Sequence, residues 1–297
     1  MVKDRILLRG RPLARAIVLG TMTLAAAAMV YGAVVEPRQL HMVPHSVGVN
    51  ELPADCEGVR IDLVSDIHTG SLNNGVDNLD RLVGDLKRSD ADVVLLAGDY
   101  VILSVLGGTY VSGATVAHHL QPLARQKPTY AVLGNHDWWK NGQQIAQDFR
   151  KAGIHMTDNR AVRMKVRQCE FWLVGIGDKD EGHPDIAFAL EQTRSAPNLP
   201  KIALTHNPEL FEQIPEEVGL TLAGHTHGGQ IRVPIGGYPA FWFKPKAEST
   251  FVDGLYREPD GRALFVTRGV GTSIVSLRFG VPPEVSQLTL RRATQAR

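Results

Sequence analysis

The chain has 297 residues, of which 43% are hydrophobic and 21% are charged, and these ordinary globular values exclude a disordered, collagen-like or coiled-coil chain. Its 32 Lys and Arg nearly balance its 31 Asp and Glu, so a formal net charge of +1 gives no protein-wide basic field for binding nucleic acid. The length fits two average domains or one large α/β domain.

Charge is unevenly distributed at the N-terminus. Residues 1–15 carry a net charge of +4, and residues 16–35 contain no charged side chain. A helix of this length spans the roughly 30 Å core of a bilayer at about 1.5 Å per residue. Because a basic flank stays in the cytoplasm, we expect 1–15 to be a cytoplasmic flank and 16–35 to be a membrane anchor, with the rest of the chain outside the cytoplasm.

Two other interpretations of residues 16–35 stay open. A cleaved signal peptide could end in the alanine run 25–28, although its apolar core would exceed the usual length of about 7–15 residues. A buried core helix is disfavoured by so long an apolar stretch at the extreme N-terminus. Residues 36–57 are expected to be a linker, followed by one domain over residues 58–297.

From residue 58, short apolar runs alternate with amphipathic stretches. The runs predict strands at 59–65, 93–97, 129–133, 162–166, 171–176, 201–205, 220–223, 263–267 and 286–290. Helical spacing predicts helices over 76–86 and 145–152, and further helices begin near Asp185 and Asn207. Strands alternating with helices indicate an α/β fold with a largely parallel first half, and the closer spacing of the later strands indicates a second, more mixed sheet.

Two cysteines, Cys56 and Cys169, lie 113 positions apart with no CxxC motif. A zinc ribbon, an iron–sulfur site and a disulfide-rich scaffold are therefore disfavoured. The two residues could pair in an oxidising compartment. Because buried free cysteines are common, we expect two unpaired core thiols.

Histidines and carboxylates gather where five predicted strands end. The motifs are Asp-Ile-His at 66–68, Gly-Asp at 98–99, Gly-Asn-His-Asp at 134–137, Thr-His-Asn at 205–207 and Gly-His-Thr-His-Gly-Gly at 224–229. Residues just past the carboxyl ends of parallel strands converge on one crevice. Oxygen and imidazole ligands without a thiolate favour a hard or borderline divalent metal, so the joint pattern predicts a metal site.

Any one of these residues alone would be weak evidence. A lone Asp at a strand end is usually a helix cap or a turn former, and a lone His is usually structural. The remaining histidines are expected to have such ordinary roles: His41, His45, His118, His119, His155 and His183. The glycines beside the motifs strengthen the joint pattern, because glycine lets the backbone turn sharply and approach a bound ion or phosphate.

These five blocks, in this order, resemble those of the calcineurin-like metallophosphoesterases, and the resemblance extends from about residue 58 to the C-terminus. The segments 224–231 (GHTHGGQI) and 268–284 (RGVGTSIVSLRFGVPPE) resemble the bacterial membrane-associated phosphodiesterase branch. The resemblance implies an α/β sandwich of two β-sheets flanked by helices (αββα) and a metal-dependent phosphoric ester hydrolase. The implied bonds are phosphodiesters or pyrophosphates, in small-molecule, envelope or lipid-linked phosphate substrates.

Carried onto this sequence, the resemblance implies two divalent metal ions. One would be held by Asp66, His68 and His227, the other by Asn135, His206 and His225, and Asp99 would bridge them. A bridging carboxylate keeps such ions about 3.5–4 Å apart, and a metal-bridging hydroxide is a competent nucleophile at neutral pH. His136 is implied to be catalytic, as general acid or charge stabiliser, whereas Asp137 either orients His136 or caps the next helix. No substrate-binding residue is indicated.

Ile102 stands where purple acid phosphatases carry a tyrosine ligand, which disfavours a ferric–tyrosinate centre. Manganese, zinc, magnesium and ferrous iron all remain open. The apolar run 100–108 after Asp99, together with Trp138, Trp139 and the aromatic residues 241–243, is either ordinary core or an apolar wall beside the metals that suits an acyl or prenyl chain.

Two alternatives to a phosphoesterase are disfavoured by the sequence. The HxHxDH motif of metallo-β-lactamase-like hydrolases is absent from the sequence. A catalytically silent metal-binding or scaffold protein on the same fold is disfavoured, because all seven ligand positions and His136 are intact. A nucleic-acid partner is not expected, because a phosphate-backbone groove needs clustered Lys and Arg.

Overall fold

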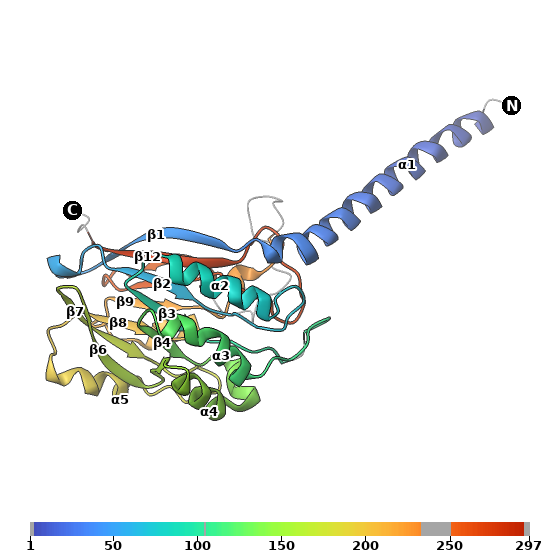
Figure 1. Cartoon of the computed structure of the whole chain (residues 1–297). Helices are drawn as coiled ribbons and strands as arrows, with labels where there is room; N and C mark the ends of the chain where they lie inside the picture. Colours follow the sequence, from blue (N-terminus) through green and yellow to red (C-terminus); the bar gives the residue numbers. More distant parts are fainter. Residues whose placement is uncertain (1–2, 104, 233–250, 294–297) are drawn as a thin grey trace.

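Buried apolar strands form two six-stranded sheets that face each other (Figure 1). The structure, a computed structural model, describes residues 3–103, 105–232 and 251–293. The first sheet contains, in spatial order, β1 (His41–Val49), β12 (Glu284–Arg292), β2 (Arg60–Val64), β3 (Val93–Ala97), β4 (Thr129–Val132) and β5 (His155–Met156). Strands β2 to β5 are parallel and β12 is antiparallel to β2, which confirms the largely parallel first half.

The second sheet is mixed, as predicted. Its spatial order is β10 (Gly254–Arg257), β11 (Ala263–Val266), β9 (Leu220–Ala223), β8 (Lys201–Leu204), β7 (Cys169–Gly175) and β6 (Arg160–Val166). The four central strands are parallel, and the edge strands β6 and β10 are antiparallel to their neighbours.

Apolar packing on both faces of the sheets explains the layers. Leu63 and Leu95 from the first sheet share one buried cluster with Leu204 and Phe265 from the second, so the main core lies between the sheets. The outer face of the first sheet is covered by α2 (Val76–Arg88), α3 (Gly113–Ala124) and α4 (Asn135–Lys151). The second sheet packs against α5 (Ile186–Glu191), η4 (Gln192–Ser195) and η5 (Pro208–Gln213). The expected αββα sandwich is confirmed.

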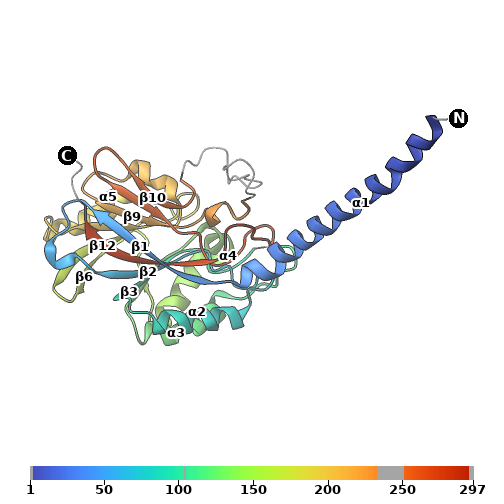
Figure 2. The same ribbon diagram turned by 90° about the horizontal axis from the view of Figure 1, so that it is seen from above.

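One long helix leaves this body at the N-terminus (Figures 1 and 2). It comprises α1 (Lys3–Val30), which continues through η1 (Tyr31–Val35) and η2 (Glu36–Arg38). The stretch Ala14–Arg38 has a hydropathy of 1.9 and is long and apolar enough to cross a membrane. The expected apolar helix is present, and it extends slightly beyond residue 35.

The segment 36–57 is more than the expected linker. It contains η2, the edge strand β1 and η3 (Ala54–Cys56), and β1 pairs in parallel with β12 from His41 to Val49. The strand was missed because Pro44, Gly48 and two histidines interrupt any regular apolar alternation. Two other short strands, β5 and β10, were also missed, and neither has an apolar run of its own.

The expectation of two free thiols is wrong, because Cys56 and Cys169 form a disulfide. The bond joins η3 to the first residue of β7, so it connects the segment before β2 to the second sheet. A separation of 113 residues hides this proximity in the sequence. Only the packing of the two sheets brings the cysteines together.

Candidate metal centre

The structure brings all the predicted strand-end residues together at the carboxyl ends of the parallel strands. Candidate ligand atoms lie within 4.8 Å of one another in three overlapping groups. These groups are Asp66 with His68 and His227, His68 with Asp99 and His136, and Asp99 with His206 and His225. Asn135 joins them, because its Oδ1 lies 3.2 Å from His206 Nε2.

Asp99 lies at the centre of the cluster. Its Oδ1 accepts a hydrogen bond from the backbone N–H of His136 at 2.9 Å, which fixes the orientation of the carboxylate. Its Oδ2 lies 3.4 Å from His68 Nε2 and 3.3 Å from His206 Nε2. One carboxylate oxygen therefore points between two imidazoles that belong to different groups, and this arrangement suits a ligand shared by two ions.

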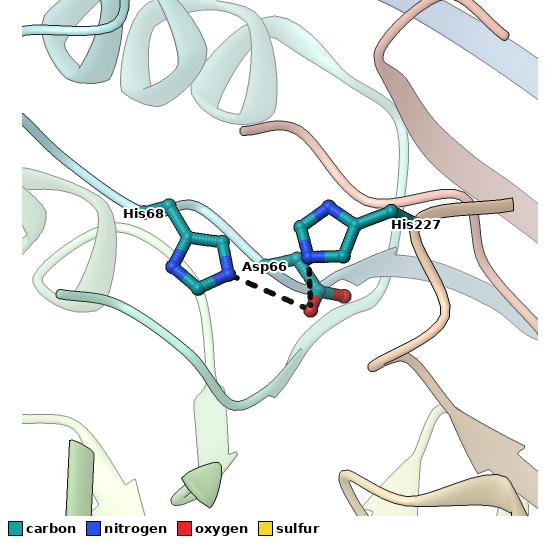
Figure 3. Close-up of side chains that lie close together, drawn as sticks. All are labelled: Asp66, His68 and His227. Carbon is teal, nitrogen blue, oxygen red and sulfur yellow. Dashed lines mark ion pairs between the residues drawn. The ribbon is translucent and has the colours of Figure 1, made fainter. Parts of the chain in front are cut away.

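The group of Asp66, His68 and His227 is shown in Figure 3. Asp66 Oδ1 lies 3.3 Å from His227 Nε2 and 4.0 Å from His68 Nε2. Both Asp66 Oδ1 and His68 Nε2 are buried and have no hydrogen-bond partner among the residues that the structure describes. Buried polar atoms are normally paired, so these unpartnered donor atoms fit a cation.

Asn135, His206 and His225 form the opposite side of the cluster. Besides its contact with Asn135, His206 Nε2 lies 3.1 Å from His225 Nδ1. The backbone N–H of His225 donates to Asp66 Oδ2 at 2.9 Å, which ties this side to the first group.

Backbone carbonyls set the direction of two of the rings. His206 Nδ1 lies 2.7 Å from the carbonyl oxygen of Ala97, and His68 Nδ1 lies 3.1 Å from that of Val101. When Nδ1 donates to these carbonyls, each Nε2 is left as a lone-pair donor toward the cluster. Fixing the tautomer in this way is typical of metal-ligating histidines.

The backbone at the cluster has unusual dihedral angles. Five candidate ligands have φ between 44° and 72°, in the left-handed region that residues other than glycine rarely adopt: Asp66, His68, Asp99, His225 and His227. Such conformations cost on the order of 1–3 kcal/mol each and are concentrated at functional sites. Glycines make the close approach possible, since a Cβ on Gly134 would lie 2.2 Å from Asp99 Oδ1.

Burial and neighbouring charges shift the pKa values of the cluster in different directions. Burial lowers the pKa of His68 and of His225 to about 3, so both rings are neutral at pH 7. Burial raises the pKa of Asp66 to about 6. Burial also opposes charge on Asp99 and His206, but their mutual attraction lowers the pKa of Asp99 and raises that of His206. Neutral imidazoles and ionised carboxylates are the forms that bind metals, so His68 and His225 are ready to bind at pH 7, whereas His206 has to release a proton first.

His136 lies at the edge of the cluster, where its side chain is 14% exposed. Its Nε2 is 4.0 Å from Asp99 Oδ2 and 3.5 Å from Ser273 Oγ, and its ring packs against Trp139 with the centroids 5.1 Å apart. His136 can therefore reach a substrate bound at the cluster.

Asp137 does not orient His136. Its carboxylate accepts the backbone N–H groups of Gly134, Asp99 and Tyr100 at 2.8–2.9 Å. It therefore caps the first turn of α4 and holds the loop that carries Asp99. These contacts fit the capping role.

Sequence reasoning missed Ser273, which approaches His136, and Asp178, whose charge acts on His206 and His136. Asp178 follows β7, is fully buried, and has an Oδ2 without a hydrogen-bond partner among the described residues. Its Gly-Asp motif after a strand has the same form as Gly98-Asp99 and could have been noticed. Ser273 lies in the 268–284 segment, where its position was not readable from any pattern.

The apolar run after Asp99 is mostly core. Tyr100, Val101, Ile102 and Val105 are buried, whereas Leu106 is exposed. Of the two tryptophans, Trp139 is exposed beside His136. The aromatic residues 241–243 lie outside the described residues.

A family model described as calcineurin-like phosphoesterase matches residues 59–229, which contain every residue of the cluster named in the motifs. The chain belongs to the calcineurin-like phosphoesterases. Membership in this family supports a phosphoester hydrolase with a candidate metal-binding cluster.

Three relatives illustrate this family membership. Phosphodiesterase YaeI of Escherichia coli is 37% identical over 203 residues, which cover 67% of this chain and 70% of that protein. An uncharacterized metallophosphoesterase of Helicobacter pylori is 29% identical and is covered over 61% of its length, with 80% of this chain aligned. A transmembrane protein with metallophosphoesterase domain of Danio rerio is 28% identical, with 92% of this chain and 62% of that protein covered.

Among solved structures, the 5'-nucleotidase precursor of Thermus thermophilus is 14% identical, with a TM-score of 0.47 over 71% of this chain and 48% of that chain. The phosphopantetheinyl hydrolase of Mycobacterium tuberculosis is 12% identical, with a TM-score of 0.42 over 73% of this chain and 92% of that chain.

Proposed function

We propose that the protein is a dinuclear metal-dependent phosphoesterase that hydrolyses phosphodiester or pyrophosphate bonds in envelope or lipid-linked phosphate substrates. The observation that carries the proposal is the position of Asp99 Oδ2 between His68 Nε2 and His206 Nε2, at 3.4 and 3.3 Å. Because His68 and His206 belong to two different ligand groups, a carboxylate oxygen that faces both rings suits a ligand that bridges two ions.

The donor set indicates how the residues divide between two ions. Asp66, His68 and His227 would hold one divalent ion, Asn135, His206 and His225 the other, and Asp99 both. When bound, two divalent ions would activate water for attack on phosphorus and neutralise charge on the phosphate. Oxygen and imidazole donors fit manganese, zinc, magnesium or ferrous iron.

Besides the two metal ions, we assign a catalytic role to the side chain of His136. Its Nε2 faces the cluster and is close to Asp99 Oδ2 and Ser273 Oγ. Burial lowers its pKa below the ordinary value, so the ring is neutral at pH 7. With the proton on Nε2, a neutral His136 donates a hydrogen bond to a phosphate oxygen and stabilises its charge, whereas a general-acid step would start from the imidazolium form, which gives one proton to the leaving group and becomes neutral.

The preference for diesters over monoesters is supported by the name of the Escherichia coli relative, which is a phosphodiesterase. The proposed location is a single-pass anchor with the domain outside the cytoplasm, or export after signal cleavage. It is supported by the basic flank before the apolar helix and by the Cys56–Cys169 disulfide, since disulfides persist in oxidising compartments.

The test uses the full chain in detergent, because residues 32–38 pack into the domain. Bound metal is measured, and hydrolysis of bis(p-nitrophenyl) phosphate, p-nitrophenyl phosphate, a nucleotide-sugar pyrophosphate and a lipid-linked pyrophosphate is compared. We expect about two ions per chain and turnover of the diester or a pyrophosphate that a chelator abolishes. Metal binding without turnover of any substrate would instead indicate the silent scaffold, and turnover that survives chelation would contradict a metal mechanism.

A further inference from the structure

We propose that three exposed apolar side chains, Leu72, Leu106 and Ile274, form a second contact with the lipid bilayer, and we name them the apolar rim. Through this contact the candidate metal centre faces the membrane from which the N-terminal helix emerges. The inference rests on the proposed membrane anchor and adds that the candidate metal centre acts at the bilayer surface.

The helix is joined to the domain without a flexible linker. The backbone N–H of Arg278 donates to the carbonyl oxygen of Gly32 at 2.9 Å. The carboxylate of Glu36, which is only 2% exposed, accepts the N–H groups of Gly280 and Val281 at 2.9 and 2.6 Å. A Cβ on Gly32 would lie 2.9 Å from the Arg278 carbonyl oxygen, so the fit is close. The direction of the helix therefore fixes the orientation of the domain.

A second set of contacts joins the helix end to the loop after β2. The side-chain amide of Asn73 donates to the carbonyl oxygen of Ala33 at 2.7 Å, and Arg38 donates to Asn73 Oδ1 at 2.6 Å. Leu72, the neighbour of Asn73, is 41% exposed. The first member of the apolar rim thus lies directly beside the point where the helix enters the domain.

Ser276 joins the loops that carry the three rim residues. Its hydroxyl donates to the carbonyl oxygen of Leu106 at 3.1 Å and accepts the backbone N–H of Leu72 at 3.2 Å. Leu106 is 80% exposed, and Ile274, two residues before Ser276, is 54% exposed. Figures 1 and 2 show the loop after β3 and the C-terminal segment at the end of the domain from which α1 leaves.

The same segment reaches the candidate metal centre. Ile274 follows Ser273, whose hydroxyl lies 3.5 Å from His136 Nε2, and the N–H of Gly271 donates to the Asp66 carbonyl oxygen at 2.6 Å. Ile274 itself has φ of 64°, a strained conformation for a β-branched residue. Backbone strain of this kind is concentrated at functional sites, and Ile274 holds its exposed side chain next to the residue that approaches His136.

A bilayer is the occupant that this geometry favours. Apolar side chains of a protein that lies on a membrane are buried about 5–10 Å into the boundary between headgroups and acyl chains, which is also near the depth of a lipid phosphate. Tyr110 and Trp139, both exposed, lie on the same loops and helix as the rim and the site, and Lys140 lies 4.5 Å from the Tyr110 ring centroid. Tyr, Trp and Lys are typical of a membrane interface.

The first experiment measures lipid contact without using activity. Both native cysteines are in the disulfide, so Leu106→Cys introduces a single reactive thiol, and Phe188→Cys on α5 is the matched control. The full chain is labelled with a nitrobenzoxadiazole fluorophore and reconstituted in nanodiscs with and without nitroxide-labelled phosphatidylcholine. We expect quenching at position 106 to exceed that at 188 at least threefold, and Ile274→Cys to repeat the result.

Equal quenching at 106, 274 and 188 would overturn the proposal. It would also fail if the labels at 106 and 274 were shielded by concentration-dependent self-association instead of by lipid, since the rim would then contact a second copy. Thermal unfolding of each labelled variant shows that it is folded. Because no turnover is measured, this result does not depend on the proposed reaction.

The second experiment measures the consequence for catalysis. The full chain in nanodiscs carries Leu106→Ser with Ile274→Ser, and Phe188→Ser is the control. For an amphiphilic phosphodiester embedded in the disc, we expect KM to rise roughly tenfold with kcat unchanged, because the rim no longer holds the site at the headgroups. Hydrolysis of soluble bis(p-nitrophenyl) phosphate stays within about twofold. Equal loss on both substrates would overturn the role in membrane presentation, whereas absence of all turnover in the unmodified chain would contradict only the proposed function.

Discussion

The two ends of the sandwich are built on opposite principles. At the carboxyl ends of the parallel strands, five candidate ligands have left-handed backbone angles, and Asp66 Oδ1 and His68 Nε2 have no hydrogen-bond partner among the described residues. At the amino ends, a disulfide joins Cys56 to Cys169, and Asp92 accepts hydrogen bonds from the Arg60 backbone and the Arg167 side chain. Arg167 at the far end also has a left-handed φ of 56°, but five such residues gather where the chemistry is proposed, and covalent and ionic links lie at the far end.

The largest expected effect comes from Asp99→Asn at the strained end. Because an amide cannot supply the bridging negative charge, we expect kcat/KM to fall at least about 10³-fold, or about 4 kcal/mol, with reduced metal content. Metal analysis and diester hydrolysis measure both effects. Asp90→Asn is the control, because Asp90 is exposed and lies just before the amino end of β3, and we expect this variant to keep full activity. An Asp99→Asn variant with most of its activity and metal would contradict the two-metal proposal.

The next effect separates a catalytic histidine from a ligand. His136→Ala should lower kcat by roughly 10²–10⁴-fold while metal stays bound, because its ring faces the cluster but is not needed to complete either ligand set. His155→Ala, at an exposed ring stacked on Tyr130, is the matched control. Loss of metal from the His136 variant would place His136 among the ligands instead.

The strained end was largely predictable from the sequence because its information is local. Each ligand directly follows an apolar strand, and parallel strands bring their carboxyl ends to one edge. Asp178 carries the same Gly-Asp signal and was overlooked. Ser273 and Ile274 could not be predicted, because their positions depend on how the 268–284 segment folds back over the loop after β2 and not on any periodic pattern.

The far end was less predictable for the opposite reason. The pairing of Cys56 with Cys169 depends on how two sheets pack, and nothing within about ten residues of either cysteine encodes it. Edge strand β1 escaped notice because it is half exposed and carries polar residues, so it lacks the apolar run that marks the central strands. The central strands β3 and β9 were predicted with their observed bounds and β8 to within one residue, because they are buried on both faces.

A third prediction concerns the stability of the far end. Reducing the disulfide, or replacing both cysteines in Cys56→Ser with Cys169→Ser, should lower the free energy of unfolding by about 2–5 kcal/mol, because the bond closes a long loop in the unfolded chain. Denaturant unfolding of the detergent-solubilised chain measures the change.

The contrast between the two ends of the sandwich predicts that this loss of stability does not change the rate of catalysis. At temperatures well below the unfolding transition, diester turnover should stay within about twofold, since the disulfide is remote from the strand ends that carry the cluster. A reductant should have no effect on the double variant, which serves as the control. If activity falls before the protein unfolds, the two ends are coupled and the contrast between them is wrong.

The smallest expected effect is a pH dependence of metal affinity at the strained end. Burial raises the pKa of Asp66 to about 6, so the metal-free chain carries a neutral Asp66 below that pH and an ionised one above it. A cation must displace that proton and also the proton on His206, whose pKa burial would lower but the attraction of Asp99 raises well above its ordinary value. Metal affinity should therefore rise with pH on both sides of pH 6, and more steeply below it, where Asp66 is protonated as well. His68 and His225, with pKa values lowered by burial to about 3, add no proton competition in this range.

Titration of the metal-free chain with Mn²⁺ at pH 5, 6, 7 and 8, followed by electron paramagnetic resonance, measures how the metal affinity depends on pH. A slope that is no steeper below pH 6 than above it would mean that Asp66 does not compete with the metal for a proton, and Asp66→Asn should bind more weakly and lose only the additional slope below pH 6.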